Sequence, residues 1–202
     1  MRRSREDAAE TRRAAVEAAA RLYRARGLEG VSIGDVMAEV GMTVGGFYRH
    51  FESRDALVAE ACARAFAESS QGHAAAVDAA GRAPAIEVLL ARYLSAAHRD
   101  APAAGCPLPA LVSELSHQTP PVRRTFTEGV RGMLRGIETA APRAGAEARL
   151  ALLASLVGAV ALARAVDDPA LRDRLLSDTR AYWKRALTQP PRRRPRRVKR
   201  PG

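Results

Sequence analysis

The segment from Ser32 to Phe51, SIGDVMAEVGMTVGGFYRHF, constrains the fold more than any other part of the chain. Its first half carries apolar residues at spacings of three and four, the stripe of a short amphipathic helix: Ile33, Val36, Met37 and Val40. Ser32 precedes the stripe, where its hydroxyl can cap the helix. Gly41 follows it, where a left-handed conformation can end the helix and turn the chain. We therefore predict two short helices joined by a tight turn, a helix-turn-helix.

The second of these helices carries unusual residues on its outer face. Thr43 is expected to cap it, and Phe47 and Phe51 face inward. Two adjacent glycines cost about 1 kcal/mol each relative to alanine in a helix, which a close approach of the backbone to DNA would explain. The side chains and backbone that could contact base edges or phosphates are those of Thr43, Val44, Gly45, Gly46, Tyr48 and His50. Partly buried polar aromatics are the alternative explanation for Tyr48 and His50.

Ser53 and Arg54 begin the next predicted helix. Ser53 is its expected N-cap, and a cation beside the free N–H groups of a first turn suits a phosphate. We predict that Arg54, together with Ser32, contacts the DNA backbone.

The run GMTVGGFYRHFESRDAL, preceded by VSIGDVMAEV and RRAAVEAAARLYRARG, resembles the N-terminal domain of the TetR family of transcriptional regulators. The resemblance extends from about Thr11 to Ala61. The residues in register with the family are Gly41, Gly45, Tyr48, His50, Phe51 and Arg54. It implies that residues 1–52 form a three-helix DNA-binding domain, and that the partner is double-stranded DNA carrying a palindromic operator.

The remainder of the chain predicts an all-α bundle over residues 53–188, the regulatory and dimerisation domain. The sequence is rich in alanine and leucine and lacks the alternation of apolar and polar residues that indicates strands. The expected helices are Thr11–Arg26, Ser53 to about Ser70, one from Pro84, Pro107 to about His117, Pro121 to about Ala140, Ala146–Val166 and Pro169–Leu187.

The helix predicted over Ala146–Val166 is apolar on much of its circumference, so it should be buried on more than one side. The resemblance implies that the last two helices form a four-helix homodimer interface, over roughly residues 147–187. The expected anchors are Leu171, Leu175, Tyr182 and Trp183. A purely intramolecular core is the alternative.

The resemblance also places a small-molecule effector among the helices from Pro84 to Ala140. The residues expected to line that pocket are Leu89, Leu90, Tyr93, Cys106, Leu111, Phe126, Met133 and Leu134, although an ordinary core would explain them equally well. Cys106 stands just before Pro107 at a predicted helix start, where the helix dipole can lower a thiol pKa. Cys106 is thus a candidate sensor of oxidants or electrophiles, and a buried, inert cysteine is the alternative.

The net charge of +11 is unevenly distributed. Residues 1–60 hold ten arginines and ten acidic residues, and residues 61–188 carry an excess of four bases. Residues 189–202 hold seven bases and no acid, in a proline-rich run that we expect to be disordered. This tail could add nonspecific, salt-dependent attraction to DNA, so a nonspecific DNA-compacting protein is the alternative function.

Other function classes have little support in the sequence. The four histidines form no triad or metal-binding spacing, so no enzyme, cofactor or metal site is predicted. His98, Cys106 and His117 could bind a metal only if the fold gathers them. The N-terminus lacks a secretory signal, no run of about 18 apolar residues predicts a membrane span, and two cysteines fit the cytoplasm. The sequence thus predicts a cytoplasmic DNA-binding regulator, a repressor released by a small molecule or reactive species.

Overall fold

The chain folds into helices alone over residues 5–188, the part that the computed structural model describes. This confirms the predicted all-α class. The helices are α1 (Arg5–Arg26), α2 (Ile33–Glu39), the 3₁₀-helix η1 (Val44–Arg49), α3 (Arg54–Ala79), α4 (Ala85–Tyr93), α5 (Ala96–Asp100), the 3₁₀-helix η2 (Pro102–Ala104), α6 (Leu108–Leu115), α7 (Pro120–Ala140), α8 (Ala146–Ala165) and α9 (Pro169–Thr188). Predictions about residues 189–202 fall outside the described residues.

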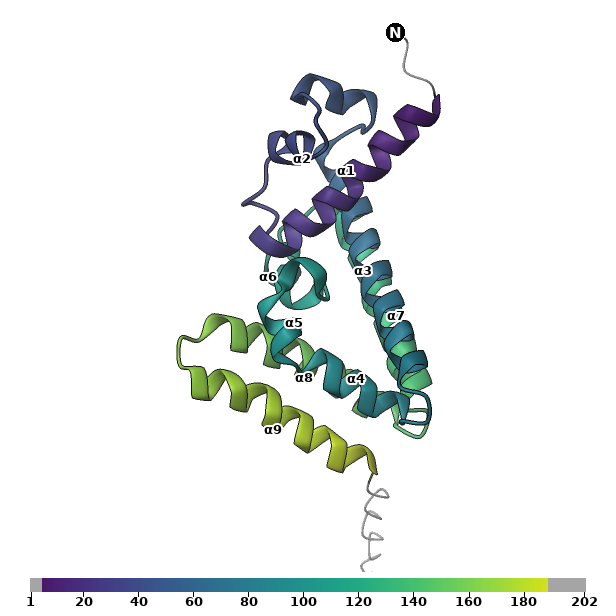
Figure 1. Cartoon of the computed structure of the whole chain (residues 1–202), viewed down its shortest axis with the longest axis vertical. Helices are drawn as coiled ribbons and strands as arrows, with labels where there is room; N and C mark the ends of the chain where they lie inside the picture. The colour runs from purple at the N-terminus through teal and green to yellow at the C-terminus, as the bar shows by residue number, and fades with distance from the viewer. Residues whose placement is uncertain (1–4, 189–202) are drawn as a thin grey trace, which may run out of the picture.

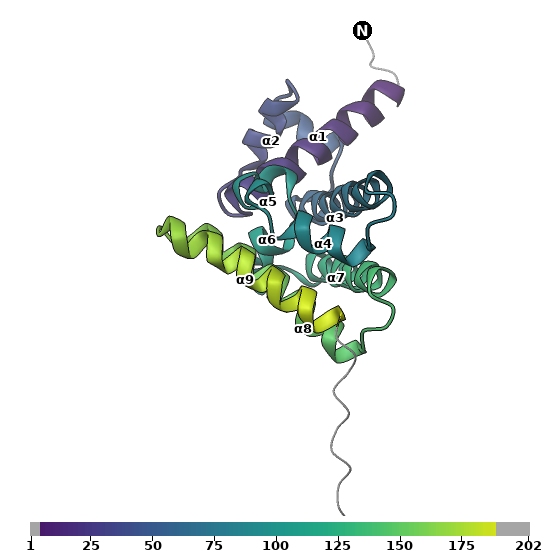
Figure 2. The ribbon, with the colours of Figure 1, turned by 60° about the horizontal axis from the view of Figure 1, so that its bottom comes forward.

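The helices are grouped at two ends of the molecule, and two long helices connect these groups (Figure 1). α1, α2 and η1 lie at one end, and α8 and α9 pack as an antiparallel pair at the other. α3 and α7 run side by side between the two ends, as both views show (Figures 1 and 2). The long α3 therefore connects the helix-turn-helix directly to the bundle.

Helix positions agree with the sequence analysis better than helix ends. α1 begins at Arg5 rather than Thr11, because Glu6 and Asp7 fall in its first turn, where acidic side chains favour a helix start. α3 continues to Ala79, beyond the predicted end near Ser70. The short α5 was not predicted, and the Ser95 hydroxyl caps it by accepting a hydrogen bond from the His98 amide.

Two apolar cores hold these helices together, and α3 contributes to both. The first core contains Leu57, Val58 and Ala61 of α3 with α1, α2 and η1, and the second contains Phe66 with the bundle helices. Leu111 and Leu115 of α6, together with Val122 of α7, also lie in the first core. Helices of the bundle therefore pack directly against the helix-turn-helix end of the molecule.

α8 bears on the expectation that the chain has no membrane span. This helix alone, among the described residues, is long and apolar enough to cross a membrane by length and composition. Its uninterrupted uncharged stretch is nevertheless bounded by Arg149 and Arg164 and is shorter than 18 residues, so the expectation that the chain has no membrane span stays a prediction. Helices in the cores of soluble proteins meet the same criterion, so the finding is weak evidence for a membrane span.

Candidate DNA-binding surface and effector cavity

α2 is fixed at both ends as its sequence predicts. The Ser32 hydroxyl accepts a hydrogen bond from the Asp35 amide at 3.1 Å, and the Asp35 carboxylate accepts one from the Ser32 amide at 2.8 Å. Hydrogen bonds from Ser32 also lower the pKa of the Asp35 carboxyl. Gly41 has a φ of +67°, the left-handed conformation expected at the turn. The Ser32 hydroxyl is already engaged within the domain, so its contact with a phosphate stays a prediction.

The second helix of the motif, η1, is a 3₁₀-helix of six residues rather than an α-helix. Its two glycines and its short length explain the difference, since both disfavour a regular α-helix. Thr43 occupies the N-cap position, but its hydroxyl makes no capping bond. The Gly46 amide donates instead to the Thr43 carbonyl oxygen at 3.0 Å.

The outer face of η1 is open. Val44 and Tyr48 are 52% and 70% exposed, values unusual for large side chains in a folded domain, and Thr43 is exposed beside them. A Cβ atom at Gly45 would have only the Thr43 hydroxyl within 4 Å, at 3.9 Å. The bareness of Gly45 is therefore not required by packing within the protein.

Gly46 differs from its neighbour. A Cβ atom there would lie 3.2 Å from the Met42 methyl carbon, so a larger residue would require the end of the Met42 side chain to shift. His50 is half-buried, and its carbonyl oxygen accepts a hydrogen bond from Arg12 of α1 at 3.0 Å. Arg12 also stacks over the Phe51 ring, 4.9 Å from its centroid, and pairs with Glu60 at 2.5 Å. Arg12 thus fixes the end of η1, a role that the sequence alone did not reveal.

Arg54 has a different environment from the one predicted. Its guanidinium donates a hydrogen bond to the Leu28 carbonyl oxygen at 2.5 Å and is half-buried. This bond joins the start of α3 to the loop after α1. A phosphate contact would require the guanidinium to leave Leu28. Ser53 caps α3 as expected, accepting from the Ala56 amide at 3.1 Å.

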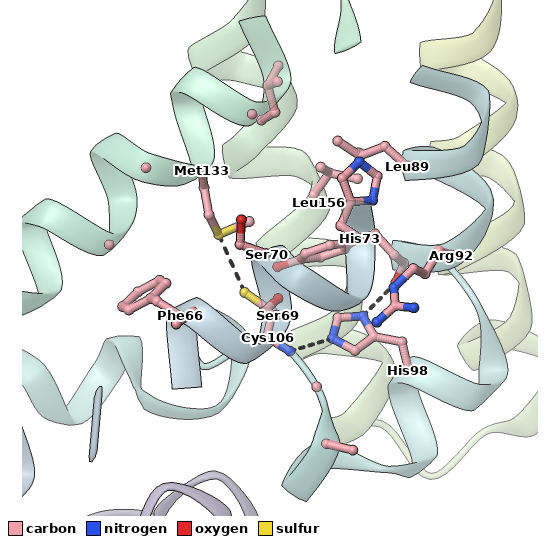
Figure 3. Close-up of a pocket in the computed structure, with 18 of the residues that line it drawn as sticks. Phe66, Ser69, Ser70, His73, Leu89, Arg92, His98, Cys106, Met133 and Leu156 are labelled. Carbon is pink, nitrogen blue, oxygen red and sulfur yellow. Dashed lines mark hydrogen bonds between the residues drawn. The ribbon is translucent and has the colours of Figure 1, made fainter. Parts of the chain in front are cut away.

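A cavity of about 470 Å³ lies in the bundle, enclosed by α3, α4, α5, α7, α8 and the segment before α6 (Figure 3). Four of the eight residues predicted for a pocket line it: Leu89, Tyr93, Cys106 and Met133. The other four do not. Leu111 belongs to the first core, Leu90 is buried in the second, Phe126 packs edge-on against Phe66, and Leu134 packs against the second core.

Polar residues of α3 and α4 line the cavity and were missed by the sequence analysis. They are Ser69, Ser70, His73 and Arg92. α7 contributes three glycines on one face, Gly129, Gly132 and Gly136. Their spacing of three and four residues was the available sequence signal, because glycines repeated on one helix face leave room beside it.

The environment of Cys106 contradicts the expected lowering of its thiol pKa. Cys106 is buried, and burial raises the pKa of its thiol despite favourable contacts with Tyr93 and Ser69. Its amide donates to the His98 ring at 3.0 Å, and its sulfur lies 3.5 Å from that of Met133. Cys62 is also a free, buried thiol, in the first core. His98, Cys106 and His117 do not gather, since the described residues hold no cluster of three potential metal ligands.

Two sets of hydrogen bonds connect the cavity region to the helix-turn-helix end. Arg24 of α1, 3% exposed, donates to the carbonyl oxygen of Gly105 at 3.1 Å and pairs with Glu68 of α3 at 2.6 Å. Glu114 of α6 accepts hydrogen bonds from the amides of Leu28 and Glu29 at 2.8 and 3.1 Å. Gly105 lines the cavity, so Arg24 bonds directly to its wall.

An open helix-turn-helix joined to a helical bundle is the architecture of a class of protein, the helical DNA-binding regulators. Residues 15–61 match the model of bacterial regulatory proteins of the tetR family, and residues 82–179 match the tetracyclin repressor-like C-terminal domain. The chain belongs to the TetR family and is a DNA-binding transcriptional regulator.

Solved structures support the same assignment. A TetR transcriptional regulator from Chloroflexus aurantiacus is 26% identical, with a TM-score of 0.73 over 89% of this chain and 96% of that one. E. coli NemR in its reduced form shares the fold at 20% identity, with a TM-score of 0.72 over 87% and 96% of the two chains. AibR in complex with isovaleryl coenzyme A and operator DNA shares it at 17% identity, with a TM-score of 0.58 over 85% and 97%. No curated protein sequence matches the chain.

Proposed function

We propose that the protein is a homodimeric, cytoplasmic repressor that binds a palindromic operator and leaves it when a small molecule occupies the cavity. The observation that carries this proposal is the bonding of Arg24 to Gly105, which connects the cavity wall to the helix that supports the DNA-binding motif. A ligand that moves Gly105 would act directly on α1. AibR, a protein of the same fold, has been seen with both an acyl-coenzyme A and operator DNA.

We assign DNA reading to the open face of η1. Tyr48 and Val44 project from it, and the bare backbone at Gly45 permits close approach to a base edge or phosphate. Thr43 adds an exposed hydroxyl with no hydrogen-bonding partner in the described part of the chain. Phe47 is buried beneath them and stacks on Phe51, with ring centroids 5.2 Å apart, which holds the face rigidly.

The proposed dimer rests on the outer surface of α8. Leu150 and Leu162 are more than half exposed, and the small residues Ala154 and Gly158 lie between them at four-residue intervals. The apolar surface continues onto α9 at Tyr182, which is 58% exposed. An exposed apolar face of this length is typical of a subunit interface. A two-fold axis there would present two copies of η1 to a palindrome.

Selection of bound sequences from a random DNA pool tests the reader assignment. The wild type is expected to enrich one palindrome, whereas Gly45→Glu is expected to lose affinity for it by about 100-fold or more, because a carboxylate would be buried against phosphates without a partner. Gly145→Glu introduces the same charge where a new side chain also meets open space, and it should bind normally. Equal, unselective binding by all three proteins would indicate nonspecific attraction and reject the proposal.

Filling the cavity tests its role as the effector site. A Cβ atom at Gly132 would approach only the end of the Arg135 side chain, at 3.7 Å, so Gly132→Leu can place its side chain in the cavity. We expect a gain of about 1–2 kcal/mol in the free energy of unfolding, measured with urea, from helix propensity and burial. We also expect operator binding that no inducing compound reverses. Thr127→Leu, on an exposed position of the same helix, is the control and should leave induction unchanged.

A further inference from the structure

The cavity has two chemically different sides. Arg92, His73 and His98 lie on one side of it, and Phe66 and Met133 lie on the other (Figure 3). Leu89 and Leu156 lie close to His73, so apolar side chains also flank the polar groups (Figure 3). A ligand that fills the whole cavity must therefore combine an apolar body with a polar head.

Arg92 is the charged group of the polar side. Its guanidinium forms no ion pair or hydrogen bond within residues 5–188. It lies against the backbone of α3 at Gly72, where an added Cβ atom would come within 2.5 Å of a guanidinium nitrogen. The glycine thus allows the cation to sit at the edge of the cavity.

No group in the cavity wall neutralises this cation. Glu128 is the one carboxylate among the lining residues, and it pairs with Arg131 at 2.5 Å. Burial and the charge of Arg92 lower the pKa of His73, which favours the neutral form of its ring. Arg92 is exposed, and it therefore places a solvated positive charge without an acidic partner at the open edge of the cavity.

His98 and Tyr93 are further polar residues of the cavity lining, and they differ in whether their polar atoms can form a hydrogen bond with a ligand. His98 uses both ring nitrogens, one with the Tyr93 carbonyl oxygen at 2.7 Å and the other with the Cys106 amide at 3.0 Å. Its role is to shape the wall. The Tyr93 hydroxyl, by contrast, is buried and has no hydrogen-bonding partner in the described structure other than the weakly interacting Cys106 thiol. An unsatisfied buried hydroxyl costs about 1–3 kcal/mol, so a ligand atom that bonds to it would recover that cost.

We propose that the cavity binds an amphipathic monoanion, with its carboxylate against the Arg92 guanidinium and its apolar body against Phe66 and Met133. This inference rests on the proposed effector role of the cavity and adds the chemical class of the effector. The carboxylate supplies the charge that Arg92 lacks, and charge-assisted hydrogen bonds to a guanidinium are among the stronger ones in proteins.

Three probes with the same ten-carbon chain test the charge preference: decanoate, decanamide and decylammonium. In calorimetric titrations at physiological salt, the wild type is expected to bind decanoate about 10- to 100-fold more tightly than decanamide, and decylammonium least. Arg92→Gln should reduce the advantage of decanoate to less than about threefold. Arg143→Gln removes an exposed arginine outside the cavity and should keep it. Gly132→Leu should abolish binding, which would locate the ligand.

The outcomes separate this inference from the proposed function. Equal binding of decanamide, tighter binding of decylammonium, or no binding of any probe would overturn the anionic ligand class. If decanoate binds through Arg92 but does not change the affinity of the protein for its selected operator, the ligand class stands and the effector role of the cavity fails. Binding together with operator release supports both.

Discussion

Arg24→Met is expected to lower the free energy of unfolding by about 2–4 kcal/mol. Arg24 is the buried charged residue of the described chain, and its guanidinium satisfies the Gly105 carbonyl oxygen and pairs with Glu68. Methionine fills similar space but donates no hydrogen bond. It would leave a buried carbonyl unsatisfied and leave Glu68 with Arg64 as its remaining partner.

Arg21→Met is the matched control for this prediction. Arg21 lies one turn earlier on α1 and pairs with Glu39 at 3.8 Å, with both side chains about half exposed. Exposed ion pairs contribute about 0–1 kcal/mol, so this variant should be nearly neutral in urea unfolding. Equal losses in the two variants would show that the Gly105 and Glu68 contacts of Arg24 contribute nothing particular to stability.

The pH dependence of the free energy of unfolding gives a second test of the contact between Arg24 and Glu68. Burial opposes ionisation of Glu68, but hydrogen bonds from Arg64 and Arg24 outweigh it and lower the pKa of its carboxyl. A carboxyl whose pKa is lowered by folding stabilises the protein above its unfolded pKa and loses that contribution as the pH falls through the folded one. Arg24→Met should therefore lose less stability than the wild type on acidification.

The helix-turn-helix could be predicted from sequence because local residues determine it. Ser32 and Asp35 are three positions apart and cap α2 reciprocally, and Gly41 supplies the left-handed turn. These signals act over one helical turn, so they can be recognised in the chain itself. Arg12 could not be found in this way, because its partners His50 and Glu60 lie 38 and 48 residues away.

The cavity was harder to predict because, like the contacts of Arg12, it is formed by residues that are far apart in the sequence. Apolar periodicity shows which face of a helix is buried, but it does not distinguish a packed core from a cavity wall. Leu111 and Leu89 are both buried on their helices, yet the first lies in the core beneath the helix-turn-helix and the second lines the cavity. The two residues can be told apart only from the tertiary structure, in which α6 packs against the first core. Polar lining such as Arg92 is also ambiguous, since a charged residue near a helix end usually faces solvent.

Leu162→Glu is expected to convert the proposed dimer to monomers and to weaken operator binding by about 1,000-fold or more. Leu162 is 54% exposed and borders an apolar groove between α8 and α9 that Gly158 and Tyr182 also line. In a two-fold dimer the substitution would bury two unpaired carboxylates, at several kcal/mol each. A monomer would contact the operator with one copy of η1 rather than two. The expected 1,000-fold loss of affinity corresponds to about 4 kcal/mol of binding free energy, since each tenfold change is about 1.4 kcal/mol.

Val112→Glu is the control for the dimer prediction, because Val112 is an exposed apolar residue on α6 that does not line the α8–α9 groove. Sedimentation velocity should show monomers for Leu162→Glu and dimers for Val112→Glu, with circular dichroism showing that both fold. Because Leu162 is more than half exposed in the single chain, a new carboxylate there remains solvated in the monomer and costs the fold little. A variant that stayed dimeric with full operator affinity would place the subunit interface elsewhere and leave the apolar face of α8 without its proposed role.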